Sequence, residues 1–209
     1  IVAIPTTSGT GSEVSRGGVI IMDSGRKLAI GSPYLIPKLA LIDPELTLGL
    51  PPHLTAGTGM DAFTHNIECF LSNAFNPPAD SIALDGLEKA WTWVERATRD
   101  GSDREARYNM AMAAMEGAMV FQKGLGAVHA LSHPTGGLKG YLLHHGTLNA
   151  VYLPAVLRFN EPARNRRTAF RHPNAFFRYA RYGGYGGYSR YGRYSGYGRY
   201  ARYGRANVF

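Results

Sequence analysis

The sequence predicts an α+β chain that ends in a disordered tail, and three observations support this division. The start of the 209-residue chain contains short β-branched runs separated by glycine, proline and hydroxyl residues. A long stretch with helical hydrophobic period follows. The end is rich in Arg, Tyr and Gly. We therefore expect a β-rich segment over 1–52, a helical domain over 53–160 and a low-complexity tail over 161–209.

The β-rich segment contains several predicted strands. A short β-branched run over 1–4 is ended by a proline, and a further buried strand is expected over 39–42. Between them, the runs 19–22 and 27–30 flank the turn residues Asp-Ser-Gly, which is typical of a β-hairpin.

Three helices are predicted after the Pro-Pro pair at 51–52, the first of them over 61–71. The second begins at Ala79, and its buried face is expected to consist of Ile82, Leu84, Leu87, Trp91 and Val94. The third begins with a predicted capping box, in which Ser102 and Glu105 satisfy free backbone donors. A methionine stripe on this helix, formed by Met112, Met115 and Met119, is interpreted as core.

Two further helices are predicted around a glycine-rich loop. One carries His129 and His133 and ends at Pro134, and the other runs over 146–159. From Arg164 the composition changes, and tyrosine recurs at every third residue from Tyr179 to Tyr203. A period of three matches neither a helix nor a strand, so we expect no packed structure there.

Charge and cysteine content exclude several classes of protein. The segment 161–209 has 11 arginines and one acidic residue, so it carries +10, and the rest carries −2 of the formal net +8. One cysteine excludes an intrachain disulfide framework and a CxxC site, and favours a reducing, cytoplasmic location. No signal peptide or membrane-length apolar run occurs. The chain starts with Ile1, so we expect it to be an internal piece of a longer protein.

Acidic and histidine side chains recur at a spacing of one helical turn. Asp61 and His65 are four residues apart, as are His129 and His133, and His145 follows the glycine-rich loop. One Asp and several His without Cys suit a first-row divalent ion, with either hydrolase or redox chemistry. The alternative is that some of these histidines merely belong to the core.

The loop over 6–13 is dense in hydroxyls and glycines. Its backbone N–H groups and hydroxyls could contact a phosphate, a ribose or a nicotinamide amide. It matches neither the GxGxxG fingerprint nor a P-loop. From the residues alone, an ordinary polar loop is equally compatible.

Five sequence blocks occur in an order that one known family shares. They are PTTSGTGSEV at 5–14, IDPEL at 42–46, GMDAFTHNIE at 59–68, GLGAVHALSHP at 124–134 and HGTLNAV at 145–151. Leu153-Pro154 and Phe159-Asn160 follow them. Over 1 to about 160, the chain thus resembles the iron-containing (group III) alcohol dehydrogenases.

The resemblance implies a site in the cleft between a dinucleotide-binding α/β domain, ending near 52, and an all-helical metal-binding domain. It implies that Fe(II) or Zn(II) is bound by Asp61, His65, His129 and His145, the last chosen over His144 because it adjoins glycine. His133 would stand near the metal as a catalytic group for proton transfer. NAD(P) would contact Thr6, Thr7, Thr10, Lys27, Thr47 and Leu48.

The implied reaction is hydride transfer between an alcohol, or an aldehyde or ketone, and the nicotinamide, with the metal as Lewis acid. A non-redox metallohydrolase is the alternative. The full-length parent is expected to be a homo-oligomer. The family's glycine-rich pyrophosphate loop and its later helices do not occur in this sequence, so we expect the fragment to be truncated and inactive.

Two hypotheses remain for the Arg/Tyr/Gly tail. It could bind RNA through guanidinium–phosphate contacts and tyrosine stacking. Alternatively, an out-of-frame continuation beginning near Arg164 would produce the strict tyrosine period, and this interpretation is favoured because the tail replaces helices that the fold needs.

Overall fold

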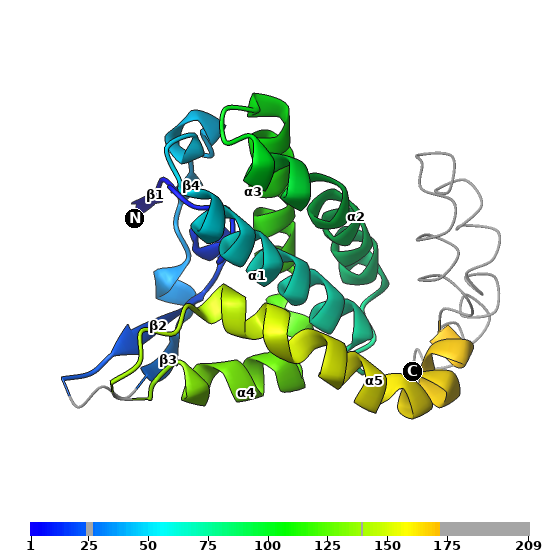
Figure 1. The fold of residues 1–209 in the computed structure, drawn as a ribbon. Coiled ribbons are helices and arrows are strands. Elements are labelled where there is room, and N and C mark those ends of the chain that lie inside the picture. Colours follow the sequence, from blue (N-terminus) through cyan, green and yellow to red (C-terminus); the bar gives the residue numbers. More distant parts are fainter. Residues whose placement is uncertain (24–26, 139, 172–209) are drawn as a thin grey trace. The chain divides into compact units, whose positions relative to one another are not determined.

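The structure is a computed structural model that describes residues 1–23, 27–138 and 140–171 (Figure 1). The side chains of Ile21, Lys27 and residues 162–171 lie outside the description. The chain divides into two units, Ile1–Val156 and Leu157–Phe209, and the candidate site belongs to the first. Its strands are β1 (Val2–Ala3), β2 (Gly17–Ile21), β3 (Lys27–Gly31) and β4 (Leu39–Ala40). The helices are α1 (Pro52–Leu71), α2 (Pro77–Arg99), α3 (Arg104–Met119), α4 (Ala127–Thr135) and α5 (His145–Arg171), with 3-10 turns η1 (Ser12–Val14), η2 (Pro33–Leu35), η3 (Pro44–Thr47) and η4 (Phe121–Lys123).

The predicted hairpin is confirmed by the antiparallel pairing of β2 with β3, in which Gly17 lies opposite Gly31. A second pair is parallel and joins β1 to β4, with Val2 opposite Leu39. The expectation of a buried strand over 39–42 is wrong, because Leu39 is 56% exposed and Leu41 53%. The pairing with β1 is two residues long and leaves these side chains uncovered.

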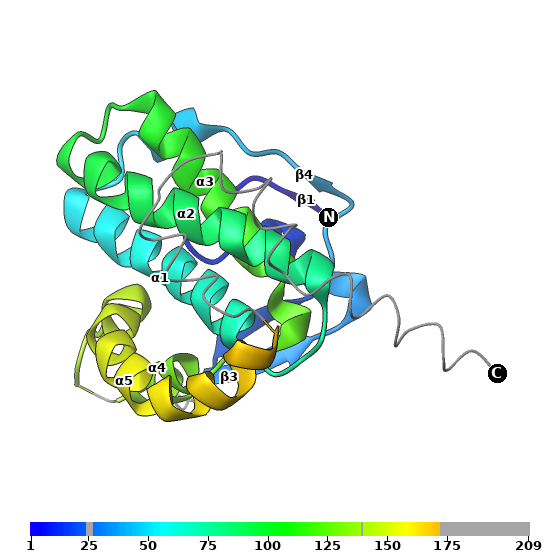
Figure 2. The ribbon, with the colours of Figure 1, turned by 90° about the vertical axis from the view of Figure 1, so that its right-hand side faces the viewer.

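The core of the first unit is a packed set of three helices, α1, α2 and α3 (Figures 1 and 2). Ten consecutive residues of α1, from Asp61 to Phe70, are buried. Many core positions on α2 and α3 are alanine, and small side chains let helix backbones approach closely. Asn66 joins two of the helices, because its amide donates to the carbonyls of Ala62 and Ala113 at 2.9 Å each.

Cys69 lies inside this core. Its side chain is fully buried, and burial raises the pKa of its thiol to about 12. The thiol is therefore protonated and unreactive in the folded chain.

The start of α3 differs from the prediction. The N-cap is Asp103, whose carboxylate accepts from the backbone N–H of Ala106 at 3.0 Å. Ser102 instead donates its hydroxyl to Asp100 at 2.6 Å, and Glu105 pairs with Arg96. Asp is as good an N-cap as Ser, so the Ser-x-x-Glu spacing placed the helix start one residue too early.

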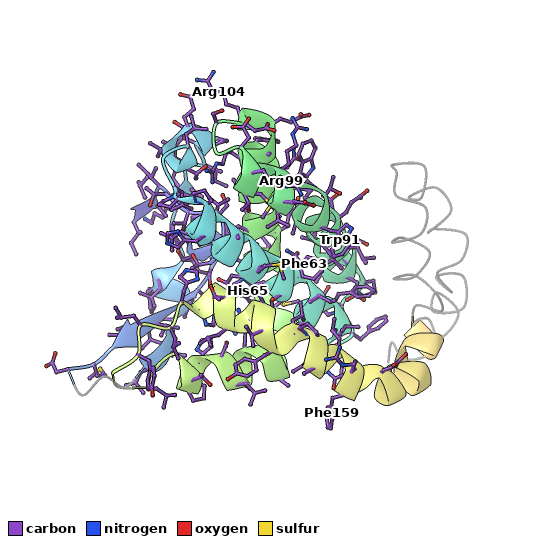
Figure 3. The ribbon with its side chains drawn as sticks, in the orientation of Figure 1. Phe63, His65, Trp91, Arg99, Arg104 and Phe159 are labelled. Atoms are coloured by element: carbon purple, nitrogen blue, oxygen red, sulfur yellow. The ribbon has the colours of Figure 1, made fainter. Side chains whose placement is uncertain are left out.

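Two predicted core faces differ in part from the structure, although Leu84 and Leu87 of α2 are buried as predicted. Trp91 is 73% exposed and contacts Phe63 of α1 from the edge of the α1–α2 interface, with ring centroids 5.9 Å apart (Figure 3). On α3 the buried face contains Met110 rather than the predicted stripe, whose last member, Met119, is 42% exposed. In both cases a large side chain lies at the border of the buried face, which consists mainly of alanine with leucine on α2 and with Met110 on α3.

The last helix extends further than predicted. α5 starts at His145, one residue before the predicted start, and continues past Phe159 to Arg171. The remainder of the predicted tail, 172–209, lies outside the described residues. Of the helices that the structure describes, none combines the length and the apolar run needed to cross a bilayer.

Candidate metal centre

Three helices of the first unit bring the acidic and histidine side chains together. Asp61 and His65 lie on neighbouring turns of α1, and both are about 95% buried. His129 is buried on α4, and His145 is the first residue of α5. Figure 3 labels His65 on α1, beside the first turn of α5.

The four side chains meet at one oxygen atom. The Nε2 atoms of His65, His129 and His145 each lie 3.5 Å from Oδ1 of Asp61. The rings of His65 and His129 stack with their centroids 4.6 Å apart. Ligand atoms of Asp61, His65 and His129 all lie within 4.8 Å of one another, as do those of His129, His133 and His145.

This donor set fits a first-row divalent ion. Three imidazole nitrogens and a carboxylate oxygen are its ordinary ligands. In a tetrahedral site with metal–ligand bonds of about 2.1 Å, the ligand atoms are about 3.4 Å apart. The 3.5 Å separations from the Asp61 oxygen match that edge. The side chain of His145 is 29% exposed, so the cluster is accessible on its side.

A close approach of two helix backbones places His145 beside Asp61. A Cβ atom on Gly146 would overlap the carbonyl oxygen of Gly57 on α1 and lie 3.2 Å from Cβ of Asp61. Any larger residue after His145 would push α5 away from α1. The glycine that follows His145 in the sequence is therefore a packing requirement of the cluster.

Buried polar side chains contact the cluster from two sides. Glu68 and Ser132 face Nδ1 atoms, whereas the amide nitrogen of Asn149 lies among the proposed ligand atoms, 3.3 Å from Nε2 of His129 and 3.4 Å from Nε2 of His145. Glu68 accepts from Nδ1 of His129 at 2.6 Å. Asn149 donates its amide to Oδ1 of Asp61 at 2.7 Å, and the hydroxyl of Ser132 lies 3.4 Å from Nδ1 of His145. None of these three residues was predicted to belong to the site. Their spacing was the available signal, because Glu68 and Asn149 follow Asp61 and His145 by two turns and one turn.

The electrostatics favour a charged carboxylate on Asp61 and a neutral imidazole on His65. Burial raises the pKa of Asp61, but the imidazoles of His65, His129 and His145 lower it to about 2. Burial lowers the pKa of His65 to about 4 in spite of Asp61. Burial also lowers the pKa of His129, but hydrogen bonds with Asp61 and Glu68 outweigh burial and raise it.

The two remaining histidines of the motif lie at different places. His133 is half-buried, and its ring stands edge-on to that of His145, with centroids 4.8 Å apart. His144 faces Thr147, with its Nδ1 atom 3.3 Å from the hydroxyl. Of the two adjacent histidines, His145 is thus the one that lies beside Asp61.

The predicted cofactor residues Thr6, Thr7 and Thr10 lie in the loop before η1. Thr6 and Thr10 are exposed and Thr7 is half-buried. The hydroxyl of Thr10 lies 3.3 Å from that of Ser12. Gly9 presses this loop against α1, because a Cβ atom there would lie 2.9 Å from Cβ of Thr58.

The other predicted cofactor residues lie in separate segments. Lys27 begins β3, and its side chain is outside the described part of the chain. Thr47 is buried and donates its hydroxyl to the carbonyl of Pro44 at 2.7 Å, so this hydroxyl stabilises the η3 turn. Leu48 ends the same turn and is half-buried.

Comparison with known families gives two matches. The profile described as Fe-containing alcohol dehydrogenase family, C-terminal, matches residues 55–176, and the one described as iron-containing alcohol dehydrogenase matches residues 1–44. The first match runs beyond Asn160, where the sequence blocks end.

Individual relatives agree with these matches. A 4-hydroxybutyrate dehydrogenase of Cupriavidus necator is 69% identical over 166 residues, which are 78% of this chain and 44% of the relative. The structure of an iron-containing alcohol dehydrogenase from Thermococcus thioreducens superposes with a TM-score of 0.71 at 34% identity, covering 77% of this chain and 41% of that one. A sulfoacetaldehyde reductase from Bifidobacterium kashiwanohense in complex with NAD+ gives 0.72 at 34% identity, with coverages of 77% and 43%.

The chain spans less than half the length of each of these relatives. The profile matches, the sequence identity and the shared fold all point the same way. The chain belongs to the iron-containing alcohol dehydrogenase family.

Proposed function

We propose that this chain carries the metal centre of an oxidoreductase that transfers a hydride between a small alcohol, or the corresponding aldehyde or ketone, and NAD(P). The observation that carries the proposal is the set of three imidazole Nε2 atoms at 3.5 Å from one oxygen of Asp61. Fe(II) or Zn(II) held there would supply Lewis-acid polarisation of the substrate oxygen. The NAD+ complex of one structural relative supports the choice of a nicotinamide cofactor.

The residues of the cluster have separate tasks in this proposal. Asp61 stays ionised and His65 stays neutral at physiological pH, because their pKa values are about 2 and about 4. They therefore offer a negative charge and a lone pair to the ion without first losing a proton. His145, on the accessible side, is the ligand next to which a substrate would bind.

His133 is proposed as the proton-transfer residue. It lies on the same helix as His129, one turn further on, and its ring contacts those of both His129 and His145. It is half-buried, so a ring nitrogen can exchange a proton with solvent or with a substrate hydroxyl.

The loop over 6–13 is proposed to contact the nicotinamide end of NAD(P). Thr6 and Thr10 are exposed, and Gly9 anchors the loop on the helix that carries Asp61 and His65. Lys27, Thr47 and Leu48 are proposed as further contacts. In this assignment, residues 1–52 belong to the dinucleotide-binding domain and 53–160 to the metal-binding domain. The homo-oligomeric state and the cytoplasmic location stay predictions.

Cobalt titration tests the metal centre. The purified 209-residue chain, stripped of metal, should bind one Co(II) per chain and give the intense visible bands of a four-coordinate site. His65→Ala should weaken Co(II) binding by at least about 100-fold, because it removes a proposed ligand. The matched control is His53→Ala, which removes an exposed histidine from the same helix. Equal binding by the two variants would overturn the proposed centre.

Turnover tests the chemistry. The chain has no glycine-rich pyrophosphate loop, so we expect no steady NAD(P)H oxidation with aldehydes, even when the site is loaded. Turnover above that of a metal-stripped control would contradict this expectation. Metal-dependent ester hydrolysis that is lost on substitution of Asp61 would favour the metallohydrolase alternative.

A further inference from the structure

Glu68 lies behind the metal cluster and binds three donors at the start of α4. It is on α1, two turns after Asp61, and its side chain is 6% exposed. Its carboxylate accepts from the backbone N–H of Val128 at 2.7 Å, from the backbone N–H of His129 at 3.4 Å and from Nδ1 of His129 at 2.6 Å.

The first two bonds cap a helix. α4 begins after Gly126 without a capping bond from its own N-cap side chain. Glu68 supplies the missing acceptor from another helix, and its negative charge is favourable at a helix N-terminus. Gly126 leaves room for it, because a Cβ atom there would lie 2.6 Å from Oε1 of Glu68.

The third bond fixes the ring of His129. An ionised carboxylate can only accept, so Nδ1 of His129 must carry the proton. The lone pair of the neutral ring then lies on Nε2, the atom that is 3.5 Å from Oδ1 of Asp61. The corresponding Nδ1 atom of His145 faces the uncharged hydroxyl of Ser132 at the longer distance of 3.4 Å.

We propose that Glu68 is the positioning residue of the metal centre, which holds His129 in the Nδ1-protonated tautomer and aims Nε2 at the ion. The inference rests on the proposed metal centre. One carboxylate thereby sets both the start of α4 and the direction of a ligand on its first turn. Metal-bound histidines commonly donate their other N–H to such a partner, and loss of the partner typically costs 10- to 100-fold in metal affinity.

The test compares two capping residues. Glu68→Ala removes the cap and the partner of His129, whereas Asp103→Ala removes the cap of α3 and touches no residue of the cluster. Both should lower the urea midpoint. Only Glu68→Ala should weaken Co(II) binding, measured by chelator competition in the folded protein, by 10- to 100-fold. Equal Co(II) affinity in the two variants would mean that Glu68 is only a helix cap and would overturn the proposal.

A second readout works without metal. Nitrogen-15 NMR of the metal-free chain, at a pH where the His129 ring is neutral, should show the proton on Nδ1, and Glu68→Gln should shift the population toward the Nε2-protonated tautomer. The glutamine keeps the size of the side chain, so it serves if Glu68→Ala does not fold. An Nε2-protonated His129 in the unsubstituted chain would overturn the role of Glu68. Failure of the unsubstituted chain to bind Co(II), with His129 protonated at Nδ1, would instead refute the metal centre.

Discussion

The helices around the candidate metal centre and the strands before them differ in how well their side chains are buried. From Asp61 to Phe70 every residue of α1 is buried, and polar side chains from α4 and α5 close over it. In the strands, by contrast, Val2, Val19, Ile20 and Leu39 are between 46% and 60% exposed. The cluster is held by packing on several sides, whereas the strand side chains have little packed against them.

This difference in burial has separate consequences for metal binding and for dinucleotide binding in the proposed reaction. The proposed ligands of an ion come from helices that pack on one another within the described chain, so we expect their geometry to be set before an ion binds. The proposed contacts with a dinucleotide lie in loops beside the exposed strands. We therefore expect metal binding to survive in this chain better than dinucleotide binding does.

The largest effect is expected at the contact between α1 and α5. Gly146→Ala would force a methyl group into the carbonyl oxygen of Gly57 and displace His145. We expect a loss of about 3 kcal/mol or more in unfolding free energy and of at least about 100-fold in Co(II) affinity. Gly49→Ala is the control, since nothing lies within 4 Å of its added Cβ atom. If both substitutions proved equally mild, the close approach would be incorrect.

A pair of isoleucines measures the difference between the regions directly. Ile67 in α1 is 1% exposed, and Ile20 in β2 is 46% exposed. Ile67→Ala should lower the unfolding free energy by about 3 kcal/mol, because it leaves a cavity. Ile20→Ala should lower it by less than about 1 kcal/mol. Urea denaturation of both variants checks this, and a larger loss at Ile20 would show that the hairpin is covered in solution.

The smallest expected effect is a pH-dependent change in stability caused by Glu116 of α3. Burial raises the pKa of Glu116 to about 7, with Asp85 adding to burial and Lys89 opposing it. The folded carboxyl therefore keeps a proton that the unfolded one has released, and stability falls as pH rises from about 4.5 to about 7.

Glu116→Gln cannot ionise and removes this loss. At pH 8 the unfolding free energy of the variant should exceed that of the unsubstituted chain by about 1 kcal/mol, after allowance for solvent screening. At pH 4.5 this difference should be smaller. Thermal unfolding at the two pH values measures the difference. Glu95→Gln, on an exposed part of α2, is the control, and an identical pH response in both variants would refute the assignment.

The sequence predicted those parts of the site that depend on local spacing. The four-residue separations of Asp61 from His65 and of His129 from His133 placed each pair on one helix face, and α1 and α4 contain them as expected. Glu68 and Asn149 escaped prediction, because they act on partners that are 61 and 88 residues away. Such contacts follow from how helices pack, which periodicity does not specify.

The wrong predictions for the N-cap of α3 and for the burial of Trp91 have a similar cause. Asp103 and Ser102 are comparable helix caps, and the choice between them depends on the neighbours, including Arg96, which pairs with Asp103. Trp91 was expected to be buried because its helical spacing places it on the same face as Leu84 and Leu87. The centre of the α2 interface is instead filled by alanine and leucine, which leaves the indole at its border.

The buried thiol of Cys69 can be used to measure local opening of α1 by its rate of chemical labelling. Alkylating reagents attack the thiolate, and a fully buried thiol with a pKa of about 12 offers almost none in the closed state. Modification therefore has to wait until α1 transiently separates from its neighbours. With a single cysteine in 209 residues, the labelling rate divided by that of an unstructured peptide gives the opening equilibrium of the very helix that carries Asp61, His65 and Glu68.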